Sequence, residues 1–255
     1  MTTDFGVSSP YVAAMKGVIA SINPDARLVD ISHAIEPQRI FEAAQVLADS
    51  TPLFPAGTIH IAVIDPGVGT ERAIVYVEFP WGRYVCPDNG LLDRLAAQSD
   101  PTMMVAVTAD RFFRHPVAAT FHGRDIMAPV AAHLSLGLDP QELGPPHDVL
   151  RQLDWPGAVK VANRITGEIV SIDSFGNLIS NITREMLADV PTDDTVSVQC
   201  DGHETRSIFS TYAEQPPMTL VALIGSTNQL EIAIVDDSAK IMLGVAVGTP
   251  IEVCW

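Results

Sequence analysis

The segment Thr58-Ile-His-Ile-Ala-Val-Ile64, followed at once by Asp65-Pro66-Gly67, decides the fold class of this chain. A mostly apolar run of this length before turn-forming residues is typical of a strand buried on both faces of a parallel sheet. Three shorter apolar runs predict further strands, at residues 27–31, 73–79 and 103–107.

Helical periodicity lies on both sides of this strand. Apolar side chains recur at helical spacing from Tyr11 to Ile22, where Ser9 suits the N-cap and Pro10 the first helical position. The spacing also predicts a helix that opens at Glu36-Pro37 and another over residues 124–136, ended by Gly137. Alternating strands and helices of this kind predict an N-terminal α/β domain with a mainly parallel sheet.

The pattern changes after Gly144-Pro145-Pro146, where helical periodicity nearly vanishes. Short apolar runs between turns predict strands over residues 167–172, 195–200, 219–224, 230–235 and 250–254. These indicate a smaller C-terminal β domain, built either as a β-sandwich or as a barrel. We therefore predict an N-terminal domain over residues 1–146, a linker of about residues 147–156 and a C-terminal domain over residues 157–255.

Composition excludes several classes of protein. The 255 residues include 15 Lys and Arg against 31 Asp and Glu, a net charge of −16 that disfavours nucleic acid as a partner. Three isolated cysteines without a CxxC pair give neither a disulfide framework nor zinc-ligand spacing. No secretory signal pattern and no apolar run of roughly 18 residues is found, so we expect a cytoplasmic protein that does not bind a membrane.

Polar clusters follow the predicted strands, which is where open α/β sheets bind ligands. Asp4 can accept hydrogen bonds from a ribose diol, although a turn with this sequence also explains it. Asp65 and Arg72 are spaced to face each other across a glycine-containing loop, either in a ligand site or as a structural ion pair. His122 precedes a predicted helix, whose dipole favours the neutral imidazole; a capping role is the alternative.

One polar segment interrupts the strands of the C-terminal half. Asp173-Ser-Phe-Gly-Asn177 places two polar side chains around an aromatic residue and a glycine. An asparagine amide has both donors and an acceptor, which suits the edge of a purine or a ligand amide. A plain hairpin turn explains the same residues.

Taken in order along the chain, these motifs resemble a known family. The matching segments are Thr3-Asp-Phe-Gly6, Lys16-Gly17, Asp30-Ile-Ser-His33, Phe54-Pro55, Val63-Ile-Asp-Pro-Gly-Val-Gly69, Arg72, Pro87-Asp-Asn-Gly90, Phe121-His-Gly-Arg-Asp125 and Asp173-Ser-Phe-Gly-Asn177. They resemble S-adenosyl-L-methionine (SAM) hydroxide adenosyltransferases, relatives of the bacterial fluorinases and chlorinases. The resemblance implies hydrolysis of SAM to adenosine and L-methionine without a metal or other cofactor. It also implies a homotrimer whose active sites lie between the N-terminal domain of one subunit and the C-terminal domain of its neighbour.

The resemblance gives roles to residues of the N-terminal half. Asp65, Arg72 and His122 match the family's Asp-Arg-His set, which positions and activates water. Asp4 matches the carboxylate that holds the ribose hydroxyls, and Phe121 is expected to contact the substrate.

In the C-terminal half the resemblance assigns substrate contacts. Asp173 and Asn177 match positions that contact the methionine ammonium and the adenine, and Ser226 and Glu231 fall in a loop that resembles the family's carboxylate- and adenine-binding loop. Ser9 departs from the family, which commonly has an acidic residue there that helps to hold the ammonium. We therefore expect Asp173 to anchor more of the amino-acid end.

Two other functions are the alternatives to hydrolysis. A SAM-dependent halogenase, forming 5′-halo-5′-deoxyadenosine, is disfavoured because Asp65 would repel a halide and because the extra loop of the fluorinases is not found. A non-catalytic protein that binds SAM or adenosine is expected to have lost Asp65, Arg72 or His122, and all three are retained.

Overall fold

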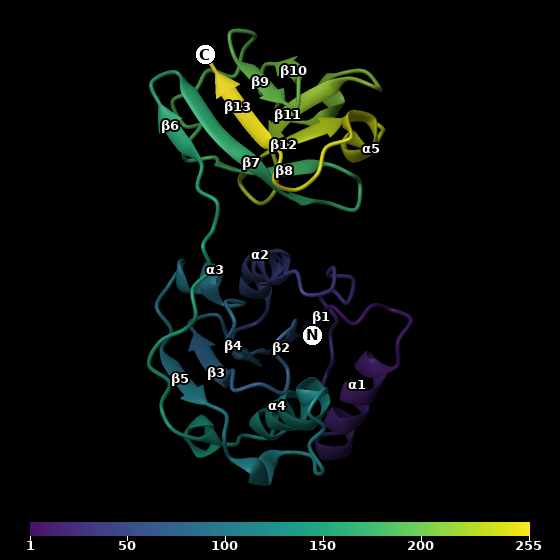
Figure 1. Cartoon of the computed structure of the whole chain (residues 1–255), viewed down its shortest axis with the longest axis vertical. Helices are drawn as coiled ribbons and strands as arrows, with labels where there is room; N and C mark the ends of the chain where they lie inside the picture. Colours follow the sequence, from purple (N-terminus) through teal and green to yellow (C-terminus); the bar gives the residue numbers. More distant parts are fainter. The chain divides into compact units, whose positions relative to one another are not determined.

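A computed structural model describes residues 1–255 of the chain. It divides into two compact units, Met1–Leu153 and Asp154–Trp255 (Figure 1). Residues 147–153, which fall in the predicted linker, are bound to the N-terminal unit: the Arg151 amide donates to Asp88 at 2.8 Å and the Leu153 amide to Asp93 at 3.3 Å. None of the helices has the length and apolar character needed to cross a membrane.

A five-stranded mixed sheet forms the centre of the N-terminal unit. Its strands lie in the order β1 (Thr2–Thr3), β2 (Ile59–Val63), β4 (Gly82–Pro87), β3 (Ile74–Phe79) and β5 (Met103–Ala106). β1 and β4 run parallel to β2, whereas β3 is antiparallel to both β4 and β5. The α/β class is confirmed, but half of the pairings are antiparallel, because β3 and β4 form a tight hairpin that the sequence pattern missed.

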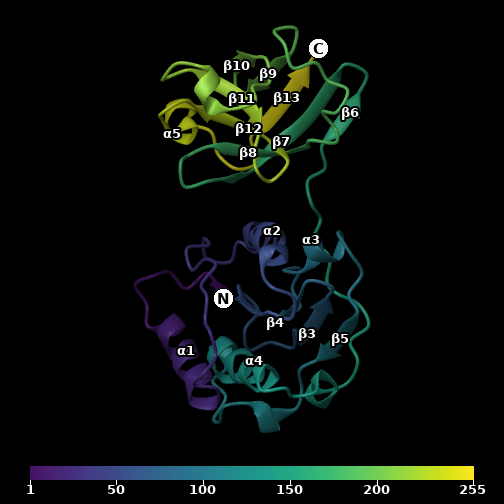
Figure 2. The same ribbon diagram turned by 180° about the vertical axis from the view of Figure 1, so that it is seen from behind.

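Helices cover both faces of this sheet (Figures 1 and 2). On one face, Met15 of α1 (Tyr11–Ile22) and Val130 of α4 (Ala128–Ser135) share a core with Val63 of β2. On the other, Leu47 of α2 (Ile40–Ser50) and Leu95 of the short α3 (Asp93–Ala96) pack beneath the same sheet. Both faces of β2 are therefore buried, as its unbroken apolar sequence predicts.

Three predictions about element ends need correction. The Ser9 hydroxyl donates to the Phe5 carbonyl at 2.7 Å and does not cap α1. Residues 27–31 are extended beside β1 but are not a strand, and only the neighbouring Ser32 forms a bridge, with Thr2. The second helix begins at Ile40 and not at Glu36-Pro37, because Gln38 has a left-handed φ of 68° that no helix accommodates.

The predicted third helix is divided into two parts. Gly123–Met127 forms a π-helical turn, and α4 continues from it to Ser135. Gly137, with φ of 93°, then donates its amide to the Leu134 carbonyl at 3.0 Å, so the predicted glycine stop is confirmed. π-turns of this kind are frequent at functional sites, and this one directly follows His122.

The C-terminal unit is a nearly closed antiparallel barrel-like sheet, as predicted. Its strand order is β10 (His203–Arg206), β9 (Ser197–Cys200), β13 (Pro250–Cys254), β7 (Arg164–Ile172), β8 (Leu178–Thr183), β12 (Gln229–Ile234) and β11 (Leu220–Ile224), with β6 (Val159–Val161) paired to β7. The Thr205 hydroxyl donates to the Leu220 carbonyl at 2.8 Å and joins the two end strands. The short helix α5 (Ala239–Leu243) was not predicted.

Candidate active site

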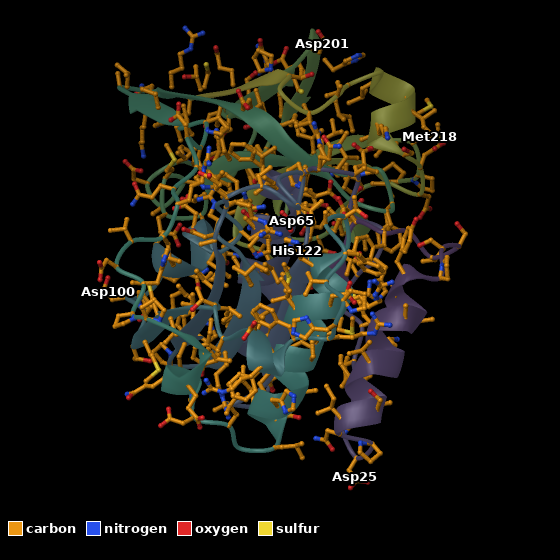
Figure 3. The ribbon with its side chains drawn as sticks, turned by 60° about the horizontal axis from the view of Figure 1, so that its bottom comes forward. Asp25, Asp65, Asp100, His122, Asp201 and Met218 are labelled. Carbon is orange, nitrogen blue, oxygen red and sulfur yellow. The ribbon has the colours of Figure 1, made fainter.

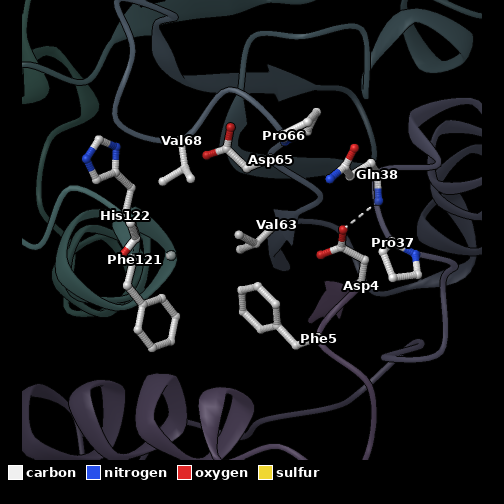
Figure 4. A pocket seen from close by; sticks show the side chains of 12 residues that line it. Asp4, Phe5, Pro37, Gln38, Val63, Asp65, Pro66, Val68, Phe121 and His122 are labelled. Carbon is white, nitrogen blue, oxygen red and sulfur yellow. Dashed lines mark hydrogen bonds between the residues drawn. The ribbon is translucent and has the colours of Figure 1, made fainter.

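A pocket of about 270 Å³ opens in the N-terminal unit where β1 and β2 end (Figure 4). The two strands are parallel, with Thr3 opposite Val63, so the residues that follow them reach the same edge of the sheet. Asp4 follows β1 directly and Asp65 comes two residues after β2, and both line the pocket. The expectation that polar residues collect at the carboxyl ends of the strands is confirmed here.

Asp65, Arg72 and His122 are in direct contact. The Arg72 guanidinium donates to both Asp65 oxygens, with 2.8 Å between Nε and Oδ1, and its Nη2 also donates to His122 Nδ1 at 3.0 Å. The side chains of Asp65 and Arg72 are only 5% and 11% exposed. Asp65 and His122 come from segments far apart in sequence, and Arg72 bridges them; Figure 3 labels both residues in the N-terminal unit.

Gly69 makes this meeting possible. Its φ is 79°, and a Cβ at this position would collide with the Ala119 carbonyl oxygen. Glycine therefore allows the loop that carries Asp65 and Arg72 to lie directly against the segment that carries His122.

His122 has a defined hydrogen-bonding state. A guanidinium can only donate, so Nδ1 must accept from Arg72, and the proton of the neutral ring is on Nε2. Burial, and then the positive charge of Arg72, lower the pKa of His122. The neutral imidazole expected from the sequence is thus supported by burial and by the charge of Arg72.

The Asp4 carboxylate is held by one hydrogen bond from a neighbouring loop. Its Oδ2 accepts a hydrogen bond from the Gln38 backbone amide at 2.9 Å, drawn as a dashed line in Figure 4. Next to it, the Thr3 hydroxyl contacts His33 Nδ1 at 2.9 Å. His33 and Lys16 in turn lie 3.0 Å and 2.6 Å from the Asp30 carboxylate.

These contacts explain why the Lys16-Gly17 and Asp30-Ile-Ser-His33 motifs accompany Asp4. Although partial burial opposes it, hydrogen bonds from Lys16 and His33 lower the pKa of Asp30. The network therefore keeps an ionised carboxylate beneath the loop that carries Asp4.

Three aromatic rings form an apolar wall beside the pocket. Phe5, Tyr11 and Phe121 meet edge to face, with ring centroids 5.3 to 5.7 Å apart. The Arg124 guanidinium lies over the Phe121 ring at 4.8 Å. Phe5 and Phe121 line the pocket directly, so they can pack against the apolar part of a ligand.

The remaining predicted site residues lie together in the C-terminal unit. Asp173 accepts hydrogen bonds from the Asn177 backbone amide and from Asn177 Nδ2, both at 2.9 Å, so these residues form a turn closed on itself. Glu231 is buried and bonds to the Tyr212 hydroxyl; burial, and the charge of Asp173, raise the pKa of Glu231. Ser226 is exposed on the turn between β11 and β12.

Comparison with known families accounts for both units. Residues 1–144 match the SAM hydroxide adenosyltransferase N-terminal domain and residues 167–252 match the C-terminal domain of the same family. The chain belongs to the SAM hydroxide adenosyltransferase family.

Relatives of this family member cover its whole length. A protein of Thermus thermophilus named (R)-S-adenosyl-L-methionine hydrolase is 38% identical to this chain, over 98% of this chain and 96% of the relative. A protein of Salinispora tropica with the same name is 36% identical, over 99% of this chain and 95% of the relative. A fluorinase of Actinopolyspora mzabensis is 26% identical, over 72% of this chain and 71% of the relative. The crystal structure of an uncharacterized conserved protein from Thermotoga maritima has a TM-score of 0.93 at 33% identity, covering 100% of this chain and 98% of that one.

The structure adds three residues that sequence reasoning did not select in this SAM hydroxide adenosyltransferase. Asn89 Nδ2 donates to the Ile64 carbonyl at 2.9 Å, directly before Asp65. Asp125, fully buried, accepts from Arg114, Arg124 and the Ala118 amide and so fixes the segment before His122. Gln38 donates its backbone amide to Asp4. Asn89 and Asp125 fall within quoted motifs, whereas no local pattern marks Gln38.

Proposed function

We propose that this chain hydrolyses SAM to adenosine and L-methionine in the pocket between Asp4 and Asp65. The family membership and the full-length relatives named (R)-SAM hydrolase support this activity. The observation that carries it is the buried Asp65–Arg72 ion pair beside His122, at the edge of an open pocket that also contains Asp4. Because the relatives' name specifies the R configuration at sulfur, we propose the R epimer as the preferred substrate.

The reaction needs a positioned nucleophile more than an activated leaving group. Water attacks the ribose C5′, a carbon–oxygen bond forms, and the carbon–sulfur bond breaks with its electron pair going to sulfur, which leaves as the neutral thioether of methionine. One water proton must be released. Since the sulfonium is already a good leaving group, most of the acceleration comes from holding the water in line with the bond that breaks.

Asp65 is the group that accepts the water's hydrogen bond. Arg72 occupies one lone pair on each carboxylate oxygen and leaves others free. Attack on carbon makes the water more acidic as the new bond forms, so a carboxylate suffices as the proton acceptor late in the step. His122 Nδ1 is occupied by Arg72, so we assign His122 to holding that guanidinium and Asp65 to receiving the proton.

Substrate binding is divided between the two units of the fold. Asp4 suits the ribose hydroxyls and Phe121 the apolar part of the ligand, whereas Asp173, Asn177, Ser226 and Glu231 are the candidates for the methionine and adenine ends. Carboxylates at both places suit a substrate with positive sulfonium and ammonium groups. The displacement requires neither a metal nor another cofactor, and we place it in the cytoplasm.

The chain is proposed to act as a homotrimer in which a neighbour's C-terminal unit completes each pocket. Sedimentation measures the assembly, and complementation tests the shared site. Asp65→Ala and Asp173→Ala chains are each expected to be inactive alone, but to regain activity when they are coexpressed, because some mixed sites then contain both carboxylates. Inactivity of the mixture, with mixed assemblies demonstrated, contradicts the shared site.

Product analysis of the purified protein tests hydrolysis. The R and S epimers of SAM are incubated separately, and chromatography should detect equal amounts of adenosine and methionine, faster from the R epimer. In water enriched in heavy oxygen, the label should appear on the adenosine 5′-hydroxyl. Intact substrate, despite measurable adenosine binding, contradicts an enzymatic function and supports the binding-protein alternative.

The role of Asp65 and the halogenase alternative are tested with the same assay. Asp65→Ala should abolish turnover and preserve adenosine binding. Added fluoride or chloride should leave the product as adenosine, and appearance of 5′-halo-5′-deoxyadenosine as the main product would favour halogenation.

A further inference from the structure

Gln38 has a backbone conformation that its sequence does not favour. Its φ is 68°, in the left-handed region where glycine and asparagine are the usual residues. Arg39 then forms an inverse γ-turn, with φ of −80° and ψ of 76°, and the Ile40 amide donates to the Gln38 carbonyl at 2.9 Å. Strain of this kind in a pocket wall is retained only where the surrounding structure or the function requires it.

The strained backbone aims a hydrogen-bond donor at Asp4. The Gln38 amide donates to Asp4 Oδ2 at 2.9 Å. An ordinary helical start at Pro37 would direct this N–H along the helix axis and remove the bond. Asp4 Oδ1 has no partner within the chain, so one carboxylate oxygen is fixed and the other remains available to a ligand.

The Gln38 side chain is also placed to contact that ligand. It lines the pocket, is exposed, and makes no hydrogen bond within the chain. Figure 4 shows its amide beside Asp4, on the side of the pocket that faces Asp65. A carboxylate can only accept hydrogen bonds, whereas a hydroxyl both donates and accepts. A ribose hydroxyl that donates to Asp4 therefore needs a separate donor, and the Gln38 amide supplies one.

We infer that Gln38 is a substrate-positioning residue: its backbone amide orients Asp4, and its side-chain amide donates to a ribose hydroxyl held by Asp4. The inference rests on the proposed function, because it takes a nucleoside as the ligand. Two polar groups that fix the ribose edge also fix the direction of C5′, which must face the water held by Asp65. Gln38 thus acts on the reaction through the orientation of the sugar.

Three variants separate the side chain from the backbone. Gln38→Ala removes the amide and keeps an L residue, and Gln38→Gly removes the amide and also relieves the strain. Both should lower kcat/KM for SAM about tenfold, the loss of one neutral hydrogen bond, whereas the melting temperature of Gln38→Gly should be unchanged or higher. Gln38→Glu, which replaces a donor with a carboxylate beside Asp4, should lower kcat/KM further.

Gln45→Ala is the matched control. Gln45 lies on the exposed side of α2, donates to Asp49 at 2.9 Å and does not line the pocket, so this variant should keep wild-type kinetics. A merely structural role for Gln38 predicts instead that activity and melting temperature change together.

Binding of nucleoside analogues identifies the contact. Adenosine, 2′-deoxyadenosine and 3′-deoxyadenosine are titrated against the wild type and Gln38→Ala. For one of the two analogues, the fold-loss of affinity relative to adenosine should be about ten times smaller in Gln38→Ala than in the wild type. The variant has already lost the side-chain amide that donates to the missing hydroxyl. Equal losses in both proteins for both analogues, or wild-type kcat/KM in all three variants, overturn the inference. An inactive wild type that still shows this coupling would contradict hydrolysis and leave the role of Gln38 standing.

Discussion

Removing the charge of Arg72 is the perturbation that best separates catalysis from stability at this site. Arg72 makes two hydrogen bonds to Asp65 and one to His122, and both members of the ion pair are nearly inaccessible to solvent. In Arg72→Gln, the Asp65 carboxylate stays buried without a counter-charge. In Asp65→Asn, the guanidinium is left in the same position. The double variant replaces both charges with amides that can still bond to each other.

The exposures of 5% and 11% set the expected magnitude. Breaking a buried pair by removing one partner costs about 3–5 kcal/mol, whereas replacing both partners is often nearly neutral. Each single variant should therefore lower the melting temperature by roughly 10 °C. The double variant should recover most of that loss, so the coupling energy should exceed the cost of one single variant, about 3 kcal/mol. Activity should not recover, because a positioned proton acceptor accelerates a reaction about 10²- to 10⁴-fold.

Thermal melts and product chromatography on the four proteins provide both measurements. Arg111→Gln is the control, because the Arg111–Glu142 pair is 60% and 52% exposed and its loss should cost less than about 1 kcal/mol. Recovery of turnover together with stability in the double variant would refute the catalytic role of Asp65 and leave a loop-stiffening ion pair. Equal stability of all four proteins would refute the energetic argument itself.

Two further predictions concern the N-terminal unit. His60 is 3% exposed, and burial lowers its pKa to about 4, below the unfolded value of 6.5. The folded state therefore keeps the neutral ring, and the free energy of unfolding is unaffected by this group above pH 6.5 but decreases as the pH falls from 6.5 toward 4. The loss amounts to about 3 kcal/mol, and urea unfolding of His60→Phe should show a smaller decline over that range; an identical decline contradicts it. Gly69→Ala should reduce turnover and the melting temperature together. Gly17→Ala, exposed within α1 with open space around its Cβ, should leave turnover unchanged and raise the melting temperature slightly, because alanine favours a helix over glycine. Wild-type behaviour of Gly69→Ala would refute the close approach to Ala119.

Strands with two buried faces could be predicted from the sequence, because their apolar residues are contiguous. β2 and β3 are of this kind. β5 was predicted from the same contiguity, although only Val105 in it is buried. β4 was missed because it begins with Gly82-Arg83 and ends in residues typical of turns, although it lies in the middle of the sheet. Its hairpin with β3 also explains why a mainly parallel sheet was expected and a mixed one is found.

The spacing of residues predicted contacts within the site only where those contacts are local. Asp65 and Arg72 are seven residues apart, and their spacing alone indicated that they face each other. The bond from Arg72 to His122 spans 50 residues and the one from Gln38 to Asp4 spans 34, so neither leaves a periodic pattern. The start of α2 was predicted too early for the same reason: Pro37 favours a helix locally, but the Gln38 amide is bound to a distant carboxylate.

The geometry around Asp65 gives a physical reason for water, and not a halide, as the nucleophile. A water molecule can donate a hydrogen bond to the carboxylate and present its lone pair to C5′. A halide has no proton to donate, so at the same place it would be repelled by the buried negative charge of Asp65. The counter-charge, Arg72, is hydrogen-bonded to the two carboxylate oxygens and does not lie between the carboxylate and the halide. Repulsion between like charges is strongest where solvent is excluded, and Asp65 is only 5% exposed. In the proposed reaction the ion pair therefore also selects the nucleophile, because it holds the carboxylate in place while Asp65 still lines the pocket.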